Sequence, residues 1–154
     1  MIPDINQAGE LELASPELMD RCWADGWRHF GSYFFRYSKM SEARGFKTVT
    51  PLRMRLKNFL LSTSQTRVMK RNSRLELRIQ DAIVDRQKLE LFALHTQRFS
   101  ENVPESLYSF LGFQPATVPC QTKELLLFKD GRLIAATFLD IGIQAGSATV
   151  SRHQ

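Results

Sequence analysis

The fold is decided by residues 123–139, which read KELLLFKDGRLIAATFL. Asp130 and Gly131 separate two apolar runs, and an Asp-Gly pair suits a type I′ turn because both central residues of that turn need a positive φ. We therefore expect two antiparallel strands, at 123–128 and 133–139, that flank a turn at Asp130 and Gly131. Both runs are apolar almost throughout, which predicts a hairpin buried on both faces.

A longer helix is expected ahead of this hairpin. Asp85 is a good N-cap residue for a helix over 86–99, because its carboxylate can accept from the first free backbone N–H groups. The apolar residues Leu89, Phe92 and Phe99 follow helical spacing on that segment. Such a stripe predicts a helix that packs one side against the core.

A second helix and a further strand complete the C-terminal part. Pro104 and Gly112 bracket a helix over 104–111, since proline fits a first helical turn and glycine a helix end. Upstream, residues 75–79 read LELRI, and this alternation predicts a strand half buried on one side. A strand, two helices and an antiparallel hairpin in this order predict an α+β chain, with helices on one side of a sheet.

The N-terminal part is expected to contain one helix and two strands. Residues 1–15 predict a loosely ordered lead-in, followed by a helix over 15–24 that starts with Ser-Pro-Glu. The aromatic-rich residues 27–37 predict a single strand. A polar turn at 38–45 and a second strand at 48–56 follow.

The aromatic residues within 27–37 have two interpretations. A buried core is the commoner role for such a cluster, and a platform for stacked bases is the other. Tyr37 lies beside a basic segment, so it is the residue that we connect with a nucleotide. We interpret His95 as a boundary histidine beside an apolar stripe and Cys120 as a packed thiol.

Positive charge is concentrated in one segment of the chain. There are 21 Lys and Arg residues against 16 Asp and Glu, a net charge of +5. About one fifth of the chain, residues 43–75, contains nine of these cations and no acidic residue, so the remainder has 12 basic residues against 16 acidic ones. The nine are Arg44, Lys47, Arg53, Arg55, Lys57, Arg67, Lys70, Arg71 and Arg74. Charge of one sign clustered in this way indicates contact with a polyanion.

Part of this basic segment predicts a phosphate-binding helix. Residues 62–72 read STSQTRVMKRN, which predicts a short helix over 65–72 capped by one of the first three residues. Arg67 shares a helix face with Lys70 or Arg71, three and four residues on. Hydroxyls and free N–H groups at a helix start suit phosphate oxygens, and arginines add bidentate donors. The candidate residues for binding tRNA or phosphate are Arg53, Ser64, Gln65, Arg67, Lys70, Arg71 and Asn72.

Several other kinds of chemistry lack their sequence signatures. There is no GxSxG, HExxH, CxxC or GxxxxGK[ST] motif, and His29, His95 and His153 lie in unrelated contexts. Cys22 and Cys120 are far apart, so we expect reduced, partly buried thiols and no metal site. No apolar run approaches the roughly 20 residues of a membrane span, and the N-terminus has no secretory signal. These features favour a cytoplasmic protein without a membrane partner.

Three stretches, in order, resemble the aminoacyl-tRNA–protein transferases. Residues 26–37, GWRHFGSYFFRY, resemble the family pattern GxRRSGxxxYRP, and residues 49–53, VTPLR, resemble its VPLR-like strand. The most specific likeness is between residues 62–72 and the pattern SxSQRRVxRRN, where serine, glutamine, a basic pair and asparagine fall in register. With the hairpin included, the similarity covers roughly residues 18–142.

The resemblance implies a fold and a reaction. The fold is an acetyltransferase-like (GNAT-type) mixed sheet covered by helices, at 61–154, with a small aromatic-rich N-terminal appendage at 1–60. The implied reaction transfers an amino acid, arginine from the overall look of the family, from aminoacyl-tRNA to the N-terminal α-amine of acceptor proteins. Acceptors begin with acidic residues, and the tagged proteins are degraded. Aminoacyl-tRNA is the co-substrate, no other cofactor is implied, and the catalytic residues stay unidentified.

The chain departs from the family pattern in two places. Where many members have a cysteine-rich loop, residues 38–44 read SKMSEAR, so the cluster bound by that loop is not expected. The family also continues beyond the hairpin, and we expect a sheet that is incomplete on its C-terminal side and exposes an apolar edge. The alternatives are a non-catalytic RNA-binding module or an inactive fragment of such a transferase. A small-molecule N-acyltransferase is a third, although the chain has no glycine-rich pyrophosphate loop.

Overall fold

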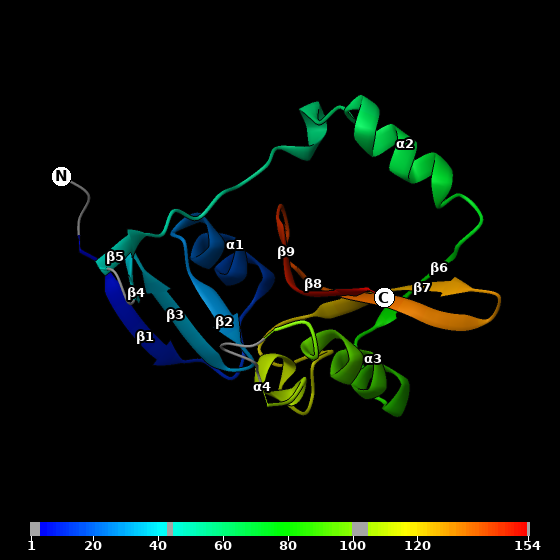
Figure 1. Ribbon diagram of the computed structural model, residues 1–154. Helices are drawn as coiled ribbons and strands as arrows, with labels where there is room; N and C mark the ends of the chain where they lie inside the picture. Colours follow the sequence, from blue (N-terminus) through cyan, green and yellow to red (C-terminus); the bar gives the residue numbers. More distant parts are fainter. Residues whose placement is uncertain (1–3, 43–44, 100–104, 154) are drawn as a thin grey trace.

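Three antiparallel sheets and four α-helices make up the computed structural model, which describes residues 4–42, 45–99 and 105–153 (Figure 1). The chain is therefore α+β, as the sequence predicts. Between β5 and β6 the chain leaves the body of the molecule as a long arm, residues 49–75, which carries the helix α2 (Thr63–Arg71) (Figure 1). None of the helices that the structure describes is long and apolar enough to cross a membrane.

The predicted hairpin lies at the centre of the largest sheet. Asp130 and Gly131 have φ values of 50° and 77°, the left-handed conformation that the expected turn requires. Their hairpin is flanked by one further strand on each side, and all neighbours pair antiparallel. In sheet order the strands are β6 (Glu76–Asp81), β7 (Thr122–Lys129), β8 (Arg132–Ile141) and β9 (Gly146–His153).

One face of this sheet is covered by α3 (Arg86–Thr96) and α4 (Tyr108–Leu111) (Figure 1). The core between them is formed by side chains from both helices, the segments beside them and the two central strands. Its buried members are Ala82, Leu91, Phe92, Leu107, Leu111, Leu126, Phe128, Ala136 and Phe138. Helices on one side of a sheet are thus confirmed.

The other face of the sheet remains open. Leu125 and Leu127 on β7 are half-buried there, so the hairpin is fully buried on one face and not on both. Their partners Leu77 and Ile79 on β6 are 53% and 60% exposed. The strand expected at 75–79 does form, as β6, but its expected half burial is wrong, because the buried core lies over the central strands and every side chain of β6 is exposed.

A second sheet forms the N-terminal side of the molecule. It has the order β1-β3-β2, with β1 (Asn6–Glu10), β2 (Arg28–Phe30) and β3 (Tyr33–Tyr37). Two expectations are corrected here. The segment 27–37 is a tight hairpin rather than one strand, because Gly31 turns the chain with a φ of 54°. The lead-in contains β1, a strand of exposed residues that is held by backbone pairing with β3.

The third sheet is a two-stranded hairpin of β4 (Lys39–Glu42) and β5 (Gly45–Thr48). It occupies the segment for which a polar turn was expected, because short polar strands can pair through their backbone without an apolar pattern. The strand expected at 48–56 does not form. After β5 the chain runs without a strand partner into the 3₁₀ turn η1 (Leu56–Asn58).

The predicted helices form with shifted ends. The helix α1 (Pro16–Ala24) is capped by the Ser15 hydroxyl, which accepts from Leu18 N at 3.2 Å, as expected. Asp85 caps α3 in the same way, but that helix ends at Thr96 and leaves Phe99 51% exposed. The last helix begins at Tyr108, and Pro104, its expected start, lies outside the described residues.

The two larger sheets are held together by polar contacts as well as packing. The Asp20 carboxylate on α1 accepts backbone N–H bonds from Ile143, Gln144 and Ala145, just after β8, at 3.1, 2.9 and 3.0 Å. Gly31 N donates to Phe110 O at 2.8 Å. The division into units at 1–60 and 61–154 stays a prediction.

Candidate nucleic-acid interface

The helix α2 begins with two reciprocal hydrogen bonds. Ser62 Oγ accepts from Gln65 N at 3.3 Å, and Gln65 Oε1 accepts from Ser62 N at 2.8 Å. This capping box satisfies backbone N–H groups that would otherwise lack partners at the helix start. It explains why nine residues form a helix here although none of their side chains is buried.

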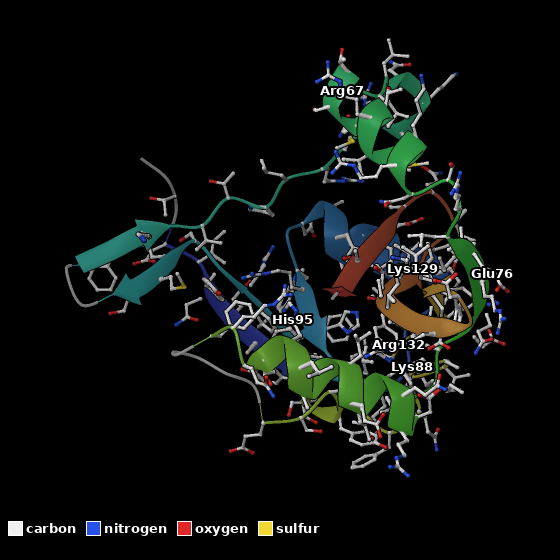
Figure 2. The ribbon with its side chains drawn as sticks, turned by 45° about the vertical axis from the view of Figure 1, so that its right-hand side comes forward. Arg67, Glu76, Lys88, His95, Lys129 and Arg132 are labelled. Atoms are coloured by element: carbon white, nitrogen blue, oxygen red, sulfur yellow. The ribbon has the colours of Figure 1, made fainter. Side chains whose placement is uncertain are left out.

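The basic side chains of α2 are all exposed. Arg67, Lys70 and Arg71 lie one turn apart, and Figure 2 shows Arg67 on the arm, away from the body of the molecule. Among the described residues, no hydrogen bond or ion pair engages the side chains of these three. Like charges at this spacing repel each other, and a polyanion would relieve the repulsion.

The structure brings together only part of the predicted site. Arg67, Lys70 and Arg71 share the last turns of α2, whereas Arg53 lies in the extended segment before η1. Ser64 and Gln65 are at the helix start and take part in the cap, since Ser64 Oγ contacts Ser62 Oγ at 3.0 Å. Asn72 is the C-cap, whose backbone N–H donates to Val68 O and Lys70 O. The seven residues therefore spread along the arm and cannot surround one phosphate.

The arm also carries exposed apolar side chains. Those with more than half of their surface exposed are Leu52, Met54, Leu56, Leu60, Leu61, Val68 and Met69, with Leu52 the highest at 89%. The arm thus presents both cations and apolar side chains to solvent. Its shape suits contact with a large partner better than a small ligand.

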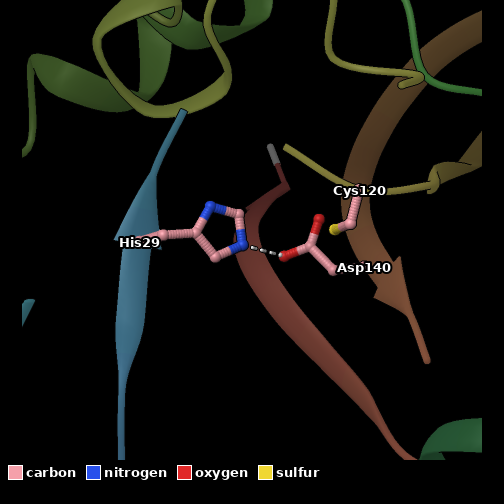
Figure 3. A group of neighbouring side chains, drawn as sticks. All are labelled: His29, Cys120 and Asp140. Carbon is pink, nitrogen blue, oxygen red and sulfur yellow. Dashed lines mark hydrogen bonds and ion pairs between the residues drawn. The ribbon is translucent and has the colours of Figure 1, made fainter. Parts of the chain in front are cut away.

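A buried polar cluster lies where the two larger sheets meet. His29 on β2 and Asp140 on β8 approach each other, with Nε2 3.0 Å from Oδ2, while His29 Nδ1 lies 3.0 Å from Gly31 O (Figure 3). Thr122 Oγ1 donates to the other carboxylate oxygen, Oδ1, at 2.6 Å. Both imidazole nitrogens thus lie within hydrogen-bond distance of an oxygen atom.

Cys120 completes this cluster. Burial, and then the charge of Asp140, raise the pKa of its thiol to about 12. The ligand atoms of His29, Cys120 and Asp140 lie within 4.8 Å of one another, the one such group in the part of the chain that the structure describes. These are ligand types that zinc accepts. Both Asp140 oxygens already take part in contacts with neighbouring side chains, however, so a metal would have to displace one of them.

The sequence did not reveal this cluster. His29 and Asp140 are 111 positions apart, and Cys120 has no partner at a metal-ligand spacing. Only the folded arrangement of β2 against β8 brings them together. The expectation that both cysteines are free thiols is confirmed, with Cys22 half-buried and Cys120 buried.

Comparison of the chain with protein-family models and with curated proteins finds no match. The family suggested by residues 26–37, 49–53 and 62–72, the aminoacyl-tRNA–protein transferases, therefore stays a prediction from the sequence. The basic arm is the feature of the structure that bears most directly on function.

Proposed function

We propose that this chain binds tRNA through its basic arm and acts as an aminoacyl-tRNA–protein transferase in the cytoplasm. The reaction would move an amino acid, arginine in the first instance, to the α-amine of proteins that begin with Asp or Glu. The observation that carries the proposal is the exposed face of Arg67, Lys70 and Arg71 on α2. It belongs to a segment of 33 residues, 43–75, that has no acidic side chain.

The charge of the arm supports a nucleic-acid partner in particular. Phosphate contacts supply most of the non-specific affinity for nucleic acids, and they need cations in a row rather than a closed pocket. Arg67 and Arg71 are four residues apart, about 6 Å along the helix axis at 1.5 Å per residue. They can therefore engage successive phosphates of one strand.

The finer fold assignment is part of the same proposal. An antiparallel sheet with α3 and α4 on one face agrees with the N-terminal part of an acetyltransferase-like domain. In that arrangement the open face of the sheet, with Leu77 and Ile79, is where further elements of such a fold would pack. The sheet β1-β3-β2 would be the N-terminal appendage.

Binding without transfer is the alternative function. The arm would hold tRNA equally well in a protein that performs no chemistry, because the phosphate contacts do not involve the amino acid. Such a module would not distinguish charged from uncharged tRNA. The assay must therefore measure transfer and binding separately.

The experiment is transfer of labelled amino acid from arginyl- and leucyl-tRNA to peptides that begin with Asp or Glu. A peptide with an acetylated N-terminus is the matched control, because it has no free α-amine. We expect label on the free peptide only. Bound tRNA with no transfer from either donor would reject the enzyme and leave the binding module, and no tRNA binding would reject both.

A further inference from the structure

A row of aromatic rings runs along one face of the N-terminal sheet. Tyr33, Phe35 and Tyr37 alternate on β3, so their side chains point to the same face. Their ring centroids are 5.9 and 6.1 Å apart, with interplanar angles of 28° and 12°. We refer to these three residues as the aromatic ladder. Its opposite side, with Phe34 and His29, forms the buried core of this sheet.

The ladder is open on the side of β1, whereas on the side of β2 the ring of Phe30 lies 5.1 Å from that of Phe35. On β1 the cross-strand neighbours of Phe35 and Tyr37 are Ala8 and Asn6, whose small side chains cannot cover the rings. Tyr33 itself is 47% exposed. The helix α1 packs on the opposite side with Met19 in the core, and α4 meets the ladder face at Phe30, whose ring lies 4.8 Å from that of Phe110. Phe35 and Tyr37 are half-buried. A row of partly exposed aromatic rings offers apolar surface to a partner.

A cation lies directly on the ladder. The Arg28 guanidinium carbon is 5.0 Å from the Phe35 centroid and 4.6 Å from the Tyr37 centroid. Arg28 is itself exposed, and its guanidinium forms no ion pair with a described acidic residue. Arg28 therefore places an exposed guanidinium group at the rings, and such a group can bind a phosphate or the edge of a base.

The ladder leads into an open hollow of about 660 Å³. Tyr37 forms one wall, and Met40 and Phe46 from the β4–β5 hairpin form another. Lys39 adds a cation, although it pairs with Asp4 at 3.1 Å. The arm starts immediately after β5 (Figure 1), and Phe46 on β5 lines the hollow.

We propose that the aromatic ladder and this hollow bind unpaired nucleotides of RNA. In single-stranded nucleic-acid binding, bases stack on aromatic side chains while cations follow the backbone. The ladder supplies the rings, Arg28 and Lys39 supply cations, and the arm supplies further charge from the same end of the sheet. The inference rests on the proposed function, in which the occupant is the unpaired 3′ end of the tRNA.

Binding of an unstructured RNA octamer ending in CCA tests the proposal, measured by fluorescence anisotropy on the full chain. Tyr33→Leu and Tyr37→Leu remove a ring but keep apolar volume. We expect each to weaken binding roughly 5- to 150-fold, the range that loss of one stacked base implies. Tyr33→Phe and Tyr37→Phe keep the ring and should bind as the unaltered protein does. Thermal unfolding of each variant shows whether the fold is intact.

The outcomes separate this inference from the proposed function. Loss in the Leu variants with an unchanged salt dependence supports the ladder, because the rings contact no phosphate. Leu variants that bind the octamer normally, while Arg67→Ala still weakens tRNA binding, would overturn the ladder and leave the function standing. If the unaltered protein binds neither the octamer nor tRNA, both the ladder proposal and the proposed function are rejected.

Discussion

His29 Nε2 lies 3.0 Å from Asp140 Oδ2, and this contact joins the first β-hairpin of the chain to the long strand β8. The side chains are only 6% and 2% exposed. A polar pair this deeply buried stabilises a fold only as a pair, because each partner alone would face an apolar interior.

We expect His29→Leu and Asp140→Leu each to lower the free energy of unfolding by about 3–5 kcal/mol. Each leaves the other group buried without its partner. The double variant removes both polar groups and should be more stable than Asp140→Leu alone. Urea unfolding of the three variants checks this. Additive losses would show that the two side chains do not depend on each other.

A buried ion pair stabilises the side of the sheet that faces α3. Lys88 Nζ lies 2.7 Å from Asp85 Oδ2 and 2.9 Å from Glu124 Oε1, and the side chains of Lys88 and Glu124 are 1% and 0% exposed. Lys88→Met should cost about 3–5 kcal/mol of unfolding free energy, because the Glu124 charge loses its partner. Arg86→Ala, which breaks the exposed pair with Glu90, is the control and should cost well under about 1 kcal/mol. Equal losses in the two variants would contradict the buried role of Lys88.

The two thiols should differ in reactivity. Burial raises the pKa of Cys120 to about 12 and, to a lesser degree, that of Cys22. In a Cys22→Ser variant, a disulfide reagent at pH 8 should modify Cys120 only after unfolding. The raised pKa also favours the folded state below pH 9, the ordinary thiol value, and this contribution is lost as the pH rises from 9 toward 12. Rapid labelling of Cys120 in the native protein would contradict its burial.

The arm should account for much of the salt dependence of tRNA binding. Each phosphate contact contributes about 0.7–0.9 to the slope of log K against log salt. Arg67→Ala with Arg71→Ala should therefore weaken binding and reduce that slope by roughly 1.4 to 1.8. Arg86→Ala removes an exposed arginine from α3 and serves as the matched control. An unchanged slope in the double variant would exclude α2 from the interface.

The features that the sequence predicts well are those with local causes. Asp130 and Gly131 define their turn by backbone conformation alone, and Ser15 and Asp85 define helix starts by capping. The same holds for α2, whose capping box joins Ser62 to Gln65, three residues on. Such signals act within a few residues, so they do not depend on how the rest of the chain folds.

The features that the sequence misses depend on distant partners. The strand β1 reads NQAGE, which has no apolar alternation, and it forms because β3 offers it a backbone edge. Residues 48–56 alternate well, but after Thr48, the last residue of β5, they find no such edge and have no partner strand. His29, Cys120 and Asp140 meet only through the packing of two sheets. The sequence shows the aromatic residues at 27–37. It does not show which of them lie on the ladder face and which are buried, because that depends on the hairpin formed at Gly31.

The arm has a consequence for how the molecule is assembled. The contacts that join the parts before and after it, such as His29 with Asp140 and Asp20 with the residues after β8, do not pass through the arm. Its Arg and Lys residues are exposed, as at the segments where proteases preferentially cut folded chains. Cleavage of the arm would leave two fragments that still associate through these contacts. An intact arm is therefore needed for ligand binding more than for the stability of the rest of the fold.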